Sequence, residues 1–334
     1  MMNRLTIARR AALCGAAALA LMASLPAMAQ GKIVLRFSSA SPPTDFLSQS
    51  MVVFKTELEK AAPEFDVQNY PGSALVRQGA EVPAIQRGNL EMMPMTTFEV
   101  SQQIPEYGFF NRAYLFRDYE HMMKVFNGPI GQAYYKKIAD VMAMEVLAPT
   151  YLGTRQVNLR AVRDVKGPAD LAGIKMRMPA TPEWLVLGNT LGVTPTPMAM
   201  PEVYLALQTG SIDGQENPLT IMNAAKFHEV TKQVVLTSHL VQPVFLTVGK
   251  PFFDKLTPAQ KDKVRAAAVA AAKMNSEGRF ADEKSVGDAL KARGLTVSQI
   301  DLAPFRANAD KLYATSDVSK AWDAKTMNEV MAVK

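Results

Sequence analysis

The pattern of hydrophobic and polar positions is clearest between residues 173 and 218. Residues 174–178, I-K-M-R-M, alternate apolar and basic side chains, a period of two that predicts a strand with one buried face. Pro179 ends this strand, because proline has no amide hydrogen to donate to the sheet. Capping residues, prolines and glycines then predict helix, strand, helix and strand in turn, over residues 181–191, 193–198, 201–209 and 212–218.

This alternation of strand and helix predicts parallel strands whose carboxyl ends share one edge of a sheet. Arg177 lies at the carboxyl end of the first strand, and Asn217 is held extended by the proline that follows it. Ligands of open α/β sheets bind at this edge. The segment therefore predicts a ligand site supplied with one fixed cation and one amide.

The rest of the chain repeats the same kind of pattern and predicts an α/β protein. Strands are expected at residues 33–37, 65–70, 90–95, 145–151, 156–162, 227–236 and 244–248, and helices at 46–62, 80–87, 121–126, 130–142 and 305–331. Residues 257–293 contain almost no helix breaker after the Thr-Pro start, which predicts one very long helix, with Gly278 or Gly287 as possible kinks. A helix of this length is better explained as a brace across two lobes than as part of one.

The first residues have the three-part pattern of a secretory signal. Three arginines precede an apolar run over residues 11–25, and the triplet A-M-A ends at Ala29, so we expect cleavage after Ala29. A membrane anchor is the alternative, but the run is shorter than the roughly 20 apolar residues that span a bilayer. Cys14, the single cysteine, lies in this segment. Cleavage would leave no thiol for disulfides, metal sites or catalysis, which favours a bacterial periplasm.

The length and net charge of the chain restrict the kinds of partner and the number of lobes that we expect. Removal of residues 1–29 takes away three arginines and no acid, and lowers the formal net charge from +6 to +3. A balance this small predicts no nucleic-acid partner. About 305 residues would remain, which is enough for two lobes with separate cores.

Arg177 is the main candidate for ligand chemistry, because the rigid guanidinium fork fits a carboxylate with two parallel hydrogen bonds. The structural alternative is an ion pair, for instance with Glu216. Asn217 could instead cap a turn, and Arg155 could be an ordinary surface arginine. Catalysis finds little support, because the three histidines are isolated and no nucleophile elbow, zinc-binding or phosphate-binding motif occurs. No cofactor is predicted.

Five segments together resemble the solute receptors of tripartite ATP-independent periplasmic (TRAP) transporters. They are GTRQ at 153–156, GIKMRMP at 173–179, PTPM at 195–198, EVYLALQTG at 202–210 and IDGQENP at 212–218. The resemblance extends over the chain after the signal, and the central motifs look most like those of the sialic-acid receptors.

The resemblance implies a two-lobed periplasmic binding protein of type II-like fold. Each lobe would hold a mixed, mostly parallel sheet flanked by helices, with a long bracing helix. Lobe I would comprise residues 30–150 plus about 244–280, and lobe II residues 151–243 plus about 281–334. Such a receptor closes around a small organic acid and delivers it to a TRAP membrane permease. We expect a monomer.

The resemblance also implies roles for individual residues. Arg177 matches the arginine that clamps the ligand's carboxylate, Arg155 matches a second arginine of that pocket, and Asn217 matches an asparagine that contacts the same carboxylate. Met200 stands where sialic-acid receptors have an aromatic wall. Thr96 falls at a polar position of the opposite lobe.

Several positions that serve the polar parts of sialic acid are not matched, namely Ala40, Gly79, Thr96 and Ala180. A buried polar group of a ligand that lacks a partner costs roughly 1 to 3 kcal/mol. The sequence therefore predicts a smaller or less hydroxylated mono- or dicarboxylate, such as a 2-oxo acid, a C4-dicarboxylate or an aromatic acid.

Two other functions stay open from the sequence. A periplasmic enzyme could use Glu81 or Glu216 on a bound acid, although neither has a recognisable catalytic partner. A receptor that senses its ligand for a signalling partner would have the same binding residues.

Overall fold

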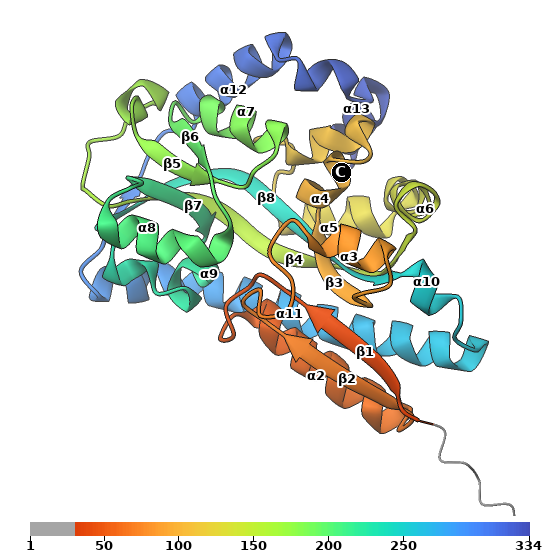
Figure 1. Cartoon of the computed structure of the whole chain (residues 1–334). Coiled ribbons are helices and arrows are strands. Elements are labelled where there is room, and N and C mark those ends of the chain that lie inside the picture. Colours follow the sequence, from red (N-terminus) through yellow and green to blue (C-terminus); the bar gives the residue numbers. More distant parts are fainter. Residues whose placement is uncertain (1–30) are drawn as a thin grey trace, which may run out of the picture. The chain divides into compact units, whose positions relative to one another are not determined.

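The strands of the protein form one mixed sheet. A computed structural model describes residues 31–334, so the predicted signal and its cleavage site lie outside the described residues. Within them the sheet has nine strands in the order β2-β1-β3-β8-β4-β7-β5-β6, with β9 beside β8 (Figure 1). The strands are β1 (Ile33–Ser38), β2 (Phe65–Tyr70), β3 (Met92–Thr96), β4 (Met144–Leu159), β5 (Lys175–Met178), β6 (Thr194–Pro197), β7 (Gly214–Pro218), β8 (Gln233–Gly249) and β9 (Thr296–Gln299).

The segment of clearest alternation forms the predicted parallel unit. β5 pairs in parallel with β6 on one side and with β7 on the other. Their carboxyl ends therefore share one edge of the sheet, as predicted. The helices between them, α7 (Pro182–Thr190) and α8 (Val203–Thr209), begin after proline-containing turns and end near glycines.

Two long antiparallel strands, β4 and β8, run through the middle of the sheet. β4 contains 16 residues and β8 contains 17, and they pair with each other along most of their length. The prediction of four short strands here is wrong. The pattern is broken at Gly153, where a left-handed φ of +130° accompanies a shift in the β4–β8 register, so the strand bulges and continues.

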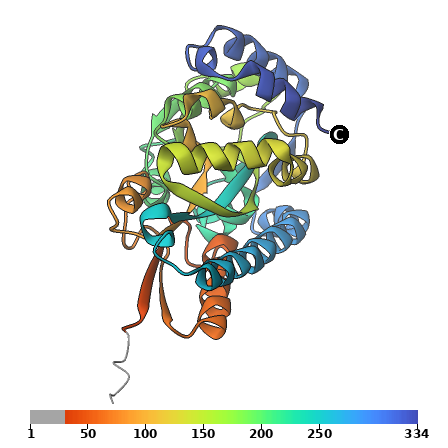
Figure 2. The same ribbon diagram turned by 90° about the vertical axis from the view of Figure 1, so that its right-hand side faces the viewer.

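The helices lie on both sides of the sheet. They are α2 (Phe46–Ala61), α3 (Glu81–Gln86), α4 (Thr97–Ser101), α5 (Tyr119–Asn127), α6 (Pro129–Met142), α7, α8, α9 (Leu219–Ala224), α10 (Lys250–Phe253), α11 (Pro258–Ala292), α12 (Ala303–Thr315) and α13 (Ala324–Ala332). Figure 2 shows α6 in front of the strands and α11 running beside α2. Among residues 31–334, no helix combines the length and apolarity needed to cross a membrane.

The predicted long helix is confirmed as α11, which contains 35 residues and starts with a capping box between Thr257 and Gln260. It packs against α2, β4 and α9. Its buried face includes four alanines, which allow close approach, and the fully buried Arg279. Arg279 forms an ion pair with Asp45, the N-cap of α2, and donates to the Thr220 hydroxyl at the start of α9 at 2.8 Å. α11 therefore joins elements that are far apart in the sequence.

The prediction of a single terminal helix over residues 305–331 is wrong. The chain forms α12, a 3-10 turn at Val318–Ala321, and then α13. Asp323 caps α13 by accepting a hydrogen bond from the Thr326 amide at 3.1 Å, and such a cap starts a new helix.

Residues Val34–Lys334 pack as one compact unit. The core consists of three hydrophobic clusters, and the second of these contains Phe98 and Trp184, which also line the site described below. The boundaries of two lobes remain a prediction.

Candidate ligand-binding site

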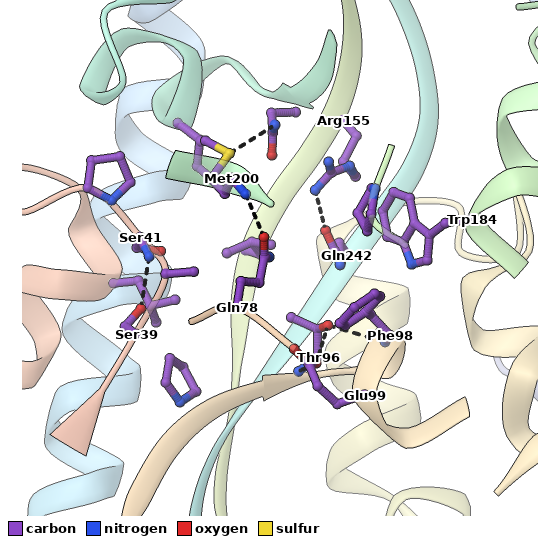
Figure 3. Close-up of a pocket in the computed structure, with 18 of the residues that line it drawn as sticks. Ser39, Ser41, Gln78, Thr96, Phe98, Glu99, Arg155, Trp184, Met200 and Gln242 are labelled. Atoms are coloured by element: carbon purple, nitrogen blue, oxygen red, sulfur yellow. Dashed lines mark hydrogen bonds between the residues drawn. The ribbon is translucent and has the colours of Figure 1, made fainter. Parts of the chain in front are cut away.

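The five residues selected from the sequence line one cavity, although they come from distant parts of the chain. Figure 3 labels three of them, Thr96, Arg155 and Met200. The cavity has a volume of about 90 Å³. Arg177 reaches it from β5, Arg155 from β4 and Asn217 from β7. Thr96 reaches it from the end of β3 and Met200 from a 3-10 turn. Their roles in binding remain predictions.

Arg177 is buried in the wall of this cavity, with only 1% of its surface exposed. Its Nε donates to the Met198 carbonyl at 2.8 Å and its Nη2 to the Gln78 side-chain oxygen at 3.2 Å. Within residues 31–334 it forms no ion pair, so the suggested pair with Glu216 is not made. Burial lowers the pKa of Arg177 to about 10, which leaves it charged at neutral pH.

Gln78 lies across from Arg177 and was not selected from the sequence. Its side-chain oxygen accepts from Arg177 and, at 2.7 Å, from the Met200 amide (Figure 3). The neighbouring Arg77 forms an exposed ion pair with Glu202 at 2.8 Å. These contacts hold the loop before α3 against the turn that contains Met200. The Arg177 Nη2 therefore donates to the neutral side-chain oxygen of Gln78.

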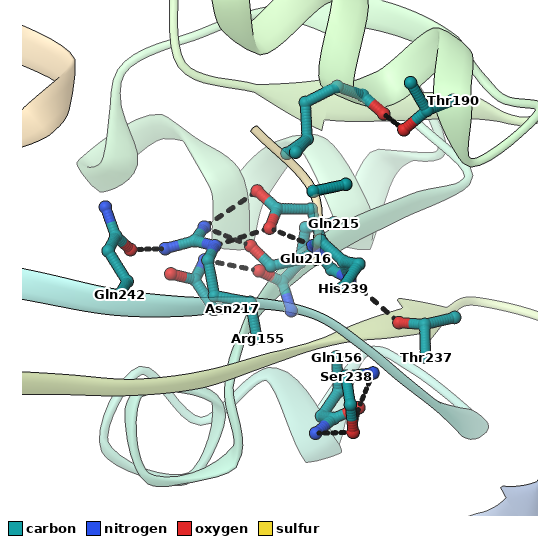
Figure 4. Close-up of polar contacts among 12 residues, drawn as sticks. Arg155, Gln156, Thr190, Gln215, Glu216, Asn217, Thr237, Ser238, His239 and Gln242 are labelled. Carbon is teal, nitrogen blue, oxygen red and sulfur yellow. Dashed lines mark hydrogen bonds and ion pairs between the residues drawn. The ribbon is translucent and has the colours of Figure 1, made fainter. Parts of the chain in front are cut away.

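Arg155 is buried and already paired, so the alternative of a surface arginine is wrong. Its Nε and Nη2 donate to the Glu216 carboxylate at 2.5 and 2.7 Å, and its Nη1 donates to Gln242 at 2.7 Å (Figure 4). Its guanidinium lies over the Trp184 ring, 4.6 Å from the ring centre. The charge of Arg155 is therefore balanced before any ligand arrives, although the side chain lines the cavity.

Glu216 also contacts His239, whose Nε2 lies 3.0 Å from its carboxylate (Figure 4). Burial alone would raise the pKa of Glu216, but Arg155 and His239 hold it below its usual value. Burial lowers the pKa of His239 despite the nearby carboxylate. The other ring nitrogen of His239, Nδ1, forms a hydrogen bond with the Thr237 hydroxyl at 2.8 Å, which fixes the orientation of the ring. Glu216 is thus ionised and forms the ion pair that balances the charge of Arg155.

Asn217 and Met200 form an adjoining part of the wall. Asn217 is 4% exposed and donates to the Gln215 side-chain oxygen at 2.6 Å. It also lies 3.9 Å from the Met200 sulfur. Asn217 is in a strand and does not cap a turn, so that alternative is wrong.

Thr96 caps α4, and its hydroxyl is used by the protein. The hydroxyl donates to Glu99 at 2.7 Å and accepts from the Phe98 amide at 3.2 Å. Glu99 also accepts from the Thr96 amide, at 2.8 Å, which completes a capping box. The T-x-x-E spacing at 96–99 is the sequence signal that could have identified Glu99.

Glu81 and Glu99 place two acids in the cavity wall. Glu81 is 3% exposed and Glu99 is 8% exposed. Burial raises the pKa of Glu81 to about 7, and burial together with the charge of Glu81 raises that of Glu99 to about 8. Neither carboxylate forms an ion pair within the described chain.

The four positions that lack the polar groups of sialic-acid receptors are divided between two cavities. Ala40 and Thr96 line the inner cavity, whereas Gly79 and Ala180 line an adjoining outer one. The inner wall still contains polar groups from Gln78, Glu81, Glu99, Asn217 and Gln242. The structural basis for expecting a poorly hydroxylated ligand is therefore removed.

The described residues contain no group of histidine, cysteine and acidic side chains suited to a metal ion. The chemistry available at this site is hydrogen bonding around one unpaired cation.

Residues 37–319 match the family described as bacterial extracellular solute-binding protein, family 7. The chain belongs to this family. The resemblance to TRAP receptors is confirmed by this match together with the similar solved structures described below, which are named TRAP periplasmic solute-binding proteins.

Family 7 relatives match most of the chain. A solute-binding protein of Verminephrobacter eiseniae is 34% identical over 284 residues, which cover 84% of each protein. The sialic acid-binding periplasmic protein of Vibrio cholerae is 28% identical over 259 residues, which cover 78% of this chain and 80% of the relative.

Solved structures confirm the binding-protein fold. A TRAP periplasmic solute-binding protein of Roseobacter denitrificans with bound 3-deoxy-D-manno-oct-2-ulosonic acid is 38% identical, with a TM-score of 0.87, and the match covers 91% of this chain and all of that one. Another, from Polaromonas, has bound D-erythronate and is 31% identical, with a TM-score of 0.84 over 91% of this chain and 99% of that one.

Proposed function

We propose that this family 7 protein is a periplasmic receptor that binds a small organic acid through its carboxylate and delivers it to a TRAP membrane permease. The observation that carries the proposal is the charge on Arg177, which is buried beside a cavity and has no acidic partner within residues 31–334. A buried charge is costly unless it is paired, and a ligand carboxylate would supply the missing partner.

The contact between Arg177 and Gln78 supports an oxygen ligand at this position. Gln78 offers a neutral amide oxygen to the Arg177 Nη2 at 3.2 Å and to the Met200 amide at 2.7 Å. A carboxylate oxygen at the same donors would form charge-assisted hydrogen bonds, which are shorter and stronger than neutral ones. Asn217 and Arg155 would complete the site as additional hydrogen-bond donors.

Two similar proteins with bound acids support a carboxylate ligand. The Roseobacter structure contains an eight-carbon sugar acid and the Polaromonas structure contains D-erythronate, and both are carboxylic acids. Closure of two lobes on the ligand would follow from contacts that the ligand makes with both of them only in the closed state.

The same proposal covers location and partners. The protein would be exported by residues 1–29, cleaved after Ala29, and act in the periplasm as a monomer without a nucleic-acid partner or cofactor. We propose binding without catalysis, because Glu216, a candidate base, is occupied by Arg155 and His239 and has a pKa below its usual value, which makes it a weak base. A sensory role would use the same ligand contacts.

Isothermal titration calorimetry of an Arg177→Lys variant tests the proposal. Lysine keeps the charge and loses the fork, so affinity for organic acids should fall at least about tenfold, or about 1.4 kcal/mol. The matched control is Arg87→Lys, because Arg87 is exposed at the end of α3. Unchanged affinity in Arg177→Lys would remove Arg177 from the site. Chemical conversion of the acid during the titration would favour the alternative that the protein is a periplasmic enzyme.

A further inference from the structure

Among the described residues, only four ionisable side chains line the cavity, and their balance limits the charge of the ligand. They are Glu81, Glu99, Arg155 and Arg177. Glu216, which lies outside the lining, holds Arg155 by two hydrogen bonds and balances its charge. Arg177 is therefore the single unbalanced cation of the cavity wall among the described residues.

The two acids provide no place for a second anionic group. Glu81 accepts a hydrogen bond from the Gly79 amide at 2.6 Å, and Glu99 accepts from both donors of Thr96. Neither is close enough to a basic side chain to form an ion pair in the described chain. Among the described residues, the only unbalanced cation of the wall, Arg177, would already be bound to the first carboxylate of the ligand. A second ligand carboxylate beside Glu81 and Glu99 would then meet two acids and no free cation, and the repulsion becomes strong at about pH 8, where the two glutamates lose their protons.

The same groups are suited to hydroxyl groups. Carboxylate and amide oxygens accept hydrogen bonds from ligand hydroxyls, and Gln242 and Asn217 add amide groups on the other part of the wall. A site built to hydrogen-bond hydroxyls rejects an analogue that lacks them, because its own buried polar groups are then left unpaired.

We propose, on the basis of the carboxylate binding proposed above, that the cavity selects hydroxylated monocarboxylates and excludes dicarboxylates. Arg177 binds the one carboxylate, and Glu81 and Glu99 accept hydrogen bonds from hydroxyls further along the ligand. The two glutamates thus determine the number of charges that the ligand carries.

Matched pairs of acids test this selectivity by calorimetry at pH 8. D-galactonate and galactarate differ only in whether the last carbon is an alcohol or a carboxylate, and D-erythronate and meso-tartrate form the same kind of pair with four carbons. The monocarboxylate of at least one pair should bind, at least tenfold more tightly than its dicarboxylate. If D-galactonate binds, hexanoate, which has the same number of carbons but no hydroxyls, should bind at least tenfold more weakly.

A double variant, Glu81→Gln with Glu99→Gln, assigns the effect to these residues. Glutamine keeps the size and the acceptor oxygen and removes the charge, so the preference for the monocarboxylate should shrink at least fivefold. Glu277→Gln is the control, because Glu277 is exposed on α11 and lies outside the cavity lining. Thermal unfolding of each variant confirms that it is folded.

The outcomes separate this inference from the proposed function. Dicarboxylates that bind as tightly as their partners, or a preference that survives in the double variant, would overturn the inference while Arg177 stays in the site. Binding of only those carboxylates that lack hydroxyls would also overturn the inference and leave Arg177 in the site. If no carboxylate binds, the proposed function itself fails.

Discussion

Gln78→Glu should weaken ligand binding, because the new carboxylate would compete with the carboxylate of the ligand for Arg177. The substitution changes one amide group to a carboxylate of nearly the same shape, 3.2 Å from Arg177 and 2.7 Å from the Met200 amide. The new carboxylate would form with Arg177 the ion pair that the native protein lacks. A ligand carboxylate would then have to displace a charged group instead of a neutral one.

The magnitude follows from the difference between these two acceptors. The bond from Arg177 has a charged donor in both proteins, so the change is counted on the bond from the Met200 amide, which is neutral in the native protein and would be made to a charged group in the variant. A neutral hydrogen bond contributes about 0.5–1.5 kcal/mol and one to a charged group about 1.5–3 kcal/mol. The difference of about 1–1.5 kcal/mol corresponds to roughly tenfold weaker ligand binding. Because Arg177 is only 1% exposed, solvent screens the new pair little. The same free energy should raise the melting temperature of the ligand-free protein by about 2 to 4 °C.

Two measurements on the same samples check this prediction. Calorimetry gives the affinity for any acid that the native protein binds, and differential scanning calorimetry gives the melting temperature without ligand. Gln78→Ala is the control, because it removes the acceptor without adding a charge and should not raise the melting temperature. If Gln78→Glu binds the acid as tightly as the native protein, the ligand does not use the donors that hold Gln78, and the role assigned to Arg177 is wrong.

Two further predictions concern stability. Arg279→Met breaks the buried ion pair with Asp45 and leaves that acid without its cation, so the free energy of unfolding in urea should fall by about 3–5 kcal/mol; a loss below about 1 kcal/mol would show that the pair is not stabilising. Glu81 and Glu99 have pKa values of about 7 and about 8 in the folded protein, against 4.5 as the reference for the unfolded chain. The folded state keeps these protons longer, so the stability of the ligand-free protein should decrease as the pH rises from about 4.5 to 8. Glu99→Gln should reduce that decrease by roughly 4 kcal/mol, and identical pH profiles of the two proteins would contradict this.

Local signals were sufficient for the elements around the site. The alternation at residues 174–178 and the proline and glycine boundaries predicted β5, α7, β6, α8 and β7 in the correct order, and the parallel pairing followed from that order. These signals act within a few residues, which explains why a single sequence reveals them. They also placed Arg177 and Asn217 on neighbouring parts of the sheet edge.

The long strands could not be predicted in this way. Gly153 interrupts the alternation in β4, and only its pairing with β8 shows that the strand continues through the bulge. Gln242 lies opposite Gly153 in that pairing and thereby reaches Arg155. Its place in the site depends on contacts between residues that are distant in the chain, and no local pattern indicates them.

The part that the two acids of the cavity play was not predicted, for a related reason: Glu81 was considered only as a catalytic base, and Glu99 was not selected. Ala40, Gly79, Thr96 and Ala180 mark positions without the expected polar groups, but a single sequence does not reveal which other side chains line the same space. Glu99 is brought into the wall because it caps the helix that starts at Thr96, and Glu81 because it lies in the first turn of α3. Both are explained by local capping, but their meeting in one cavity is a property of the tertiary fold.

The two arginines of the site show why residue type alone does not determine a role. Both are buried, both line the cavity, and each could hold a carboxylate. Glu216 is adjacent to Asn217 in β7, and its side chain meets Arg155 across the β4–β7 pairing, where Val157 is its backbone partner. Once Glu216 has neutralised Arg155, the remaining charge belongs to Arg177. The position of one acid in the strand register thus decides which arginine is left for the ligand.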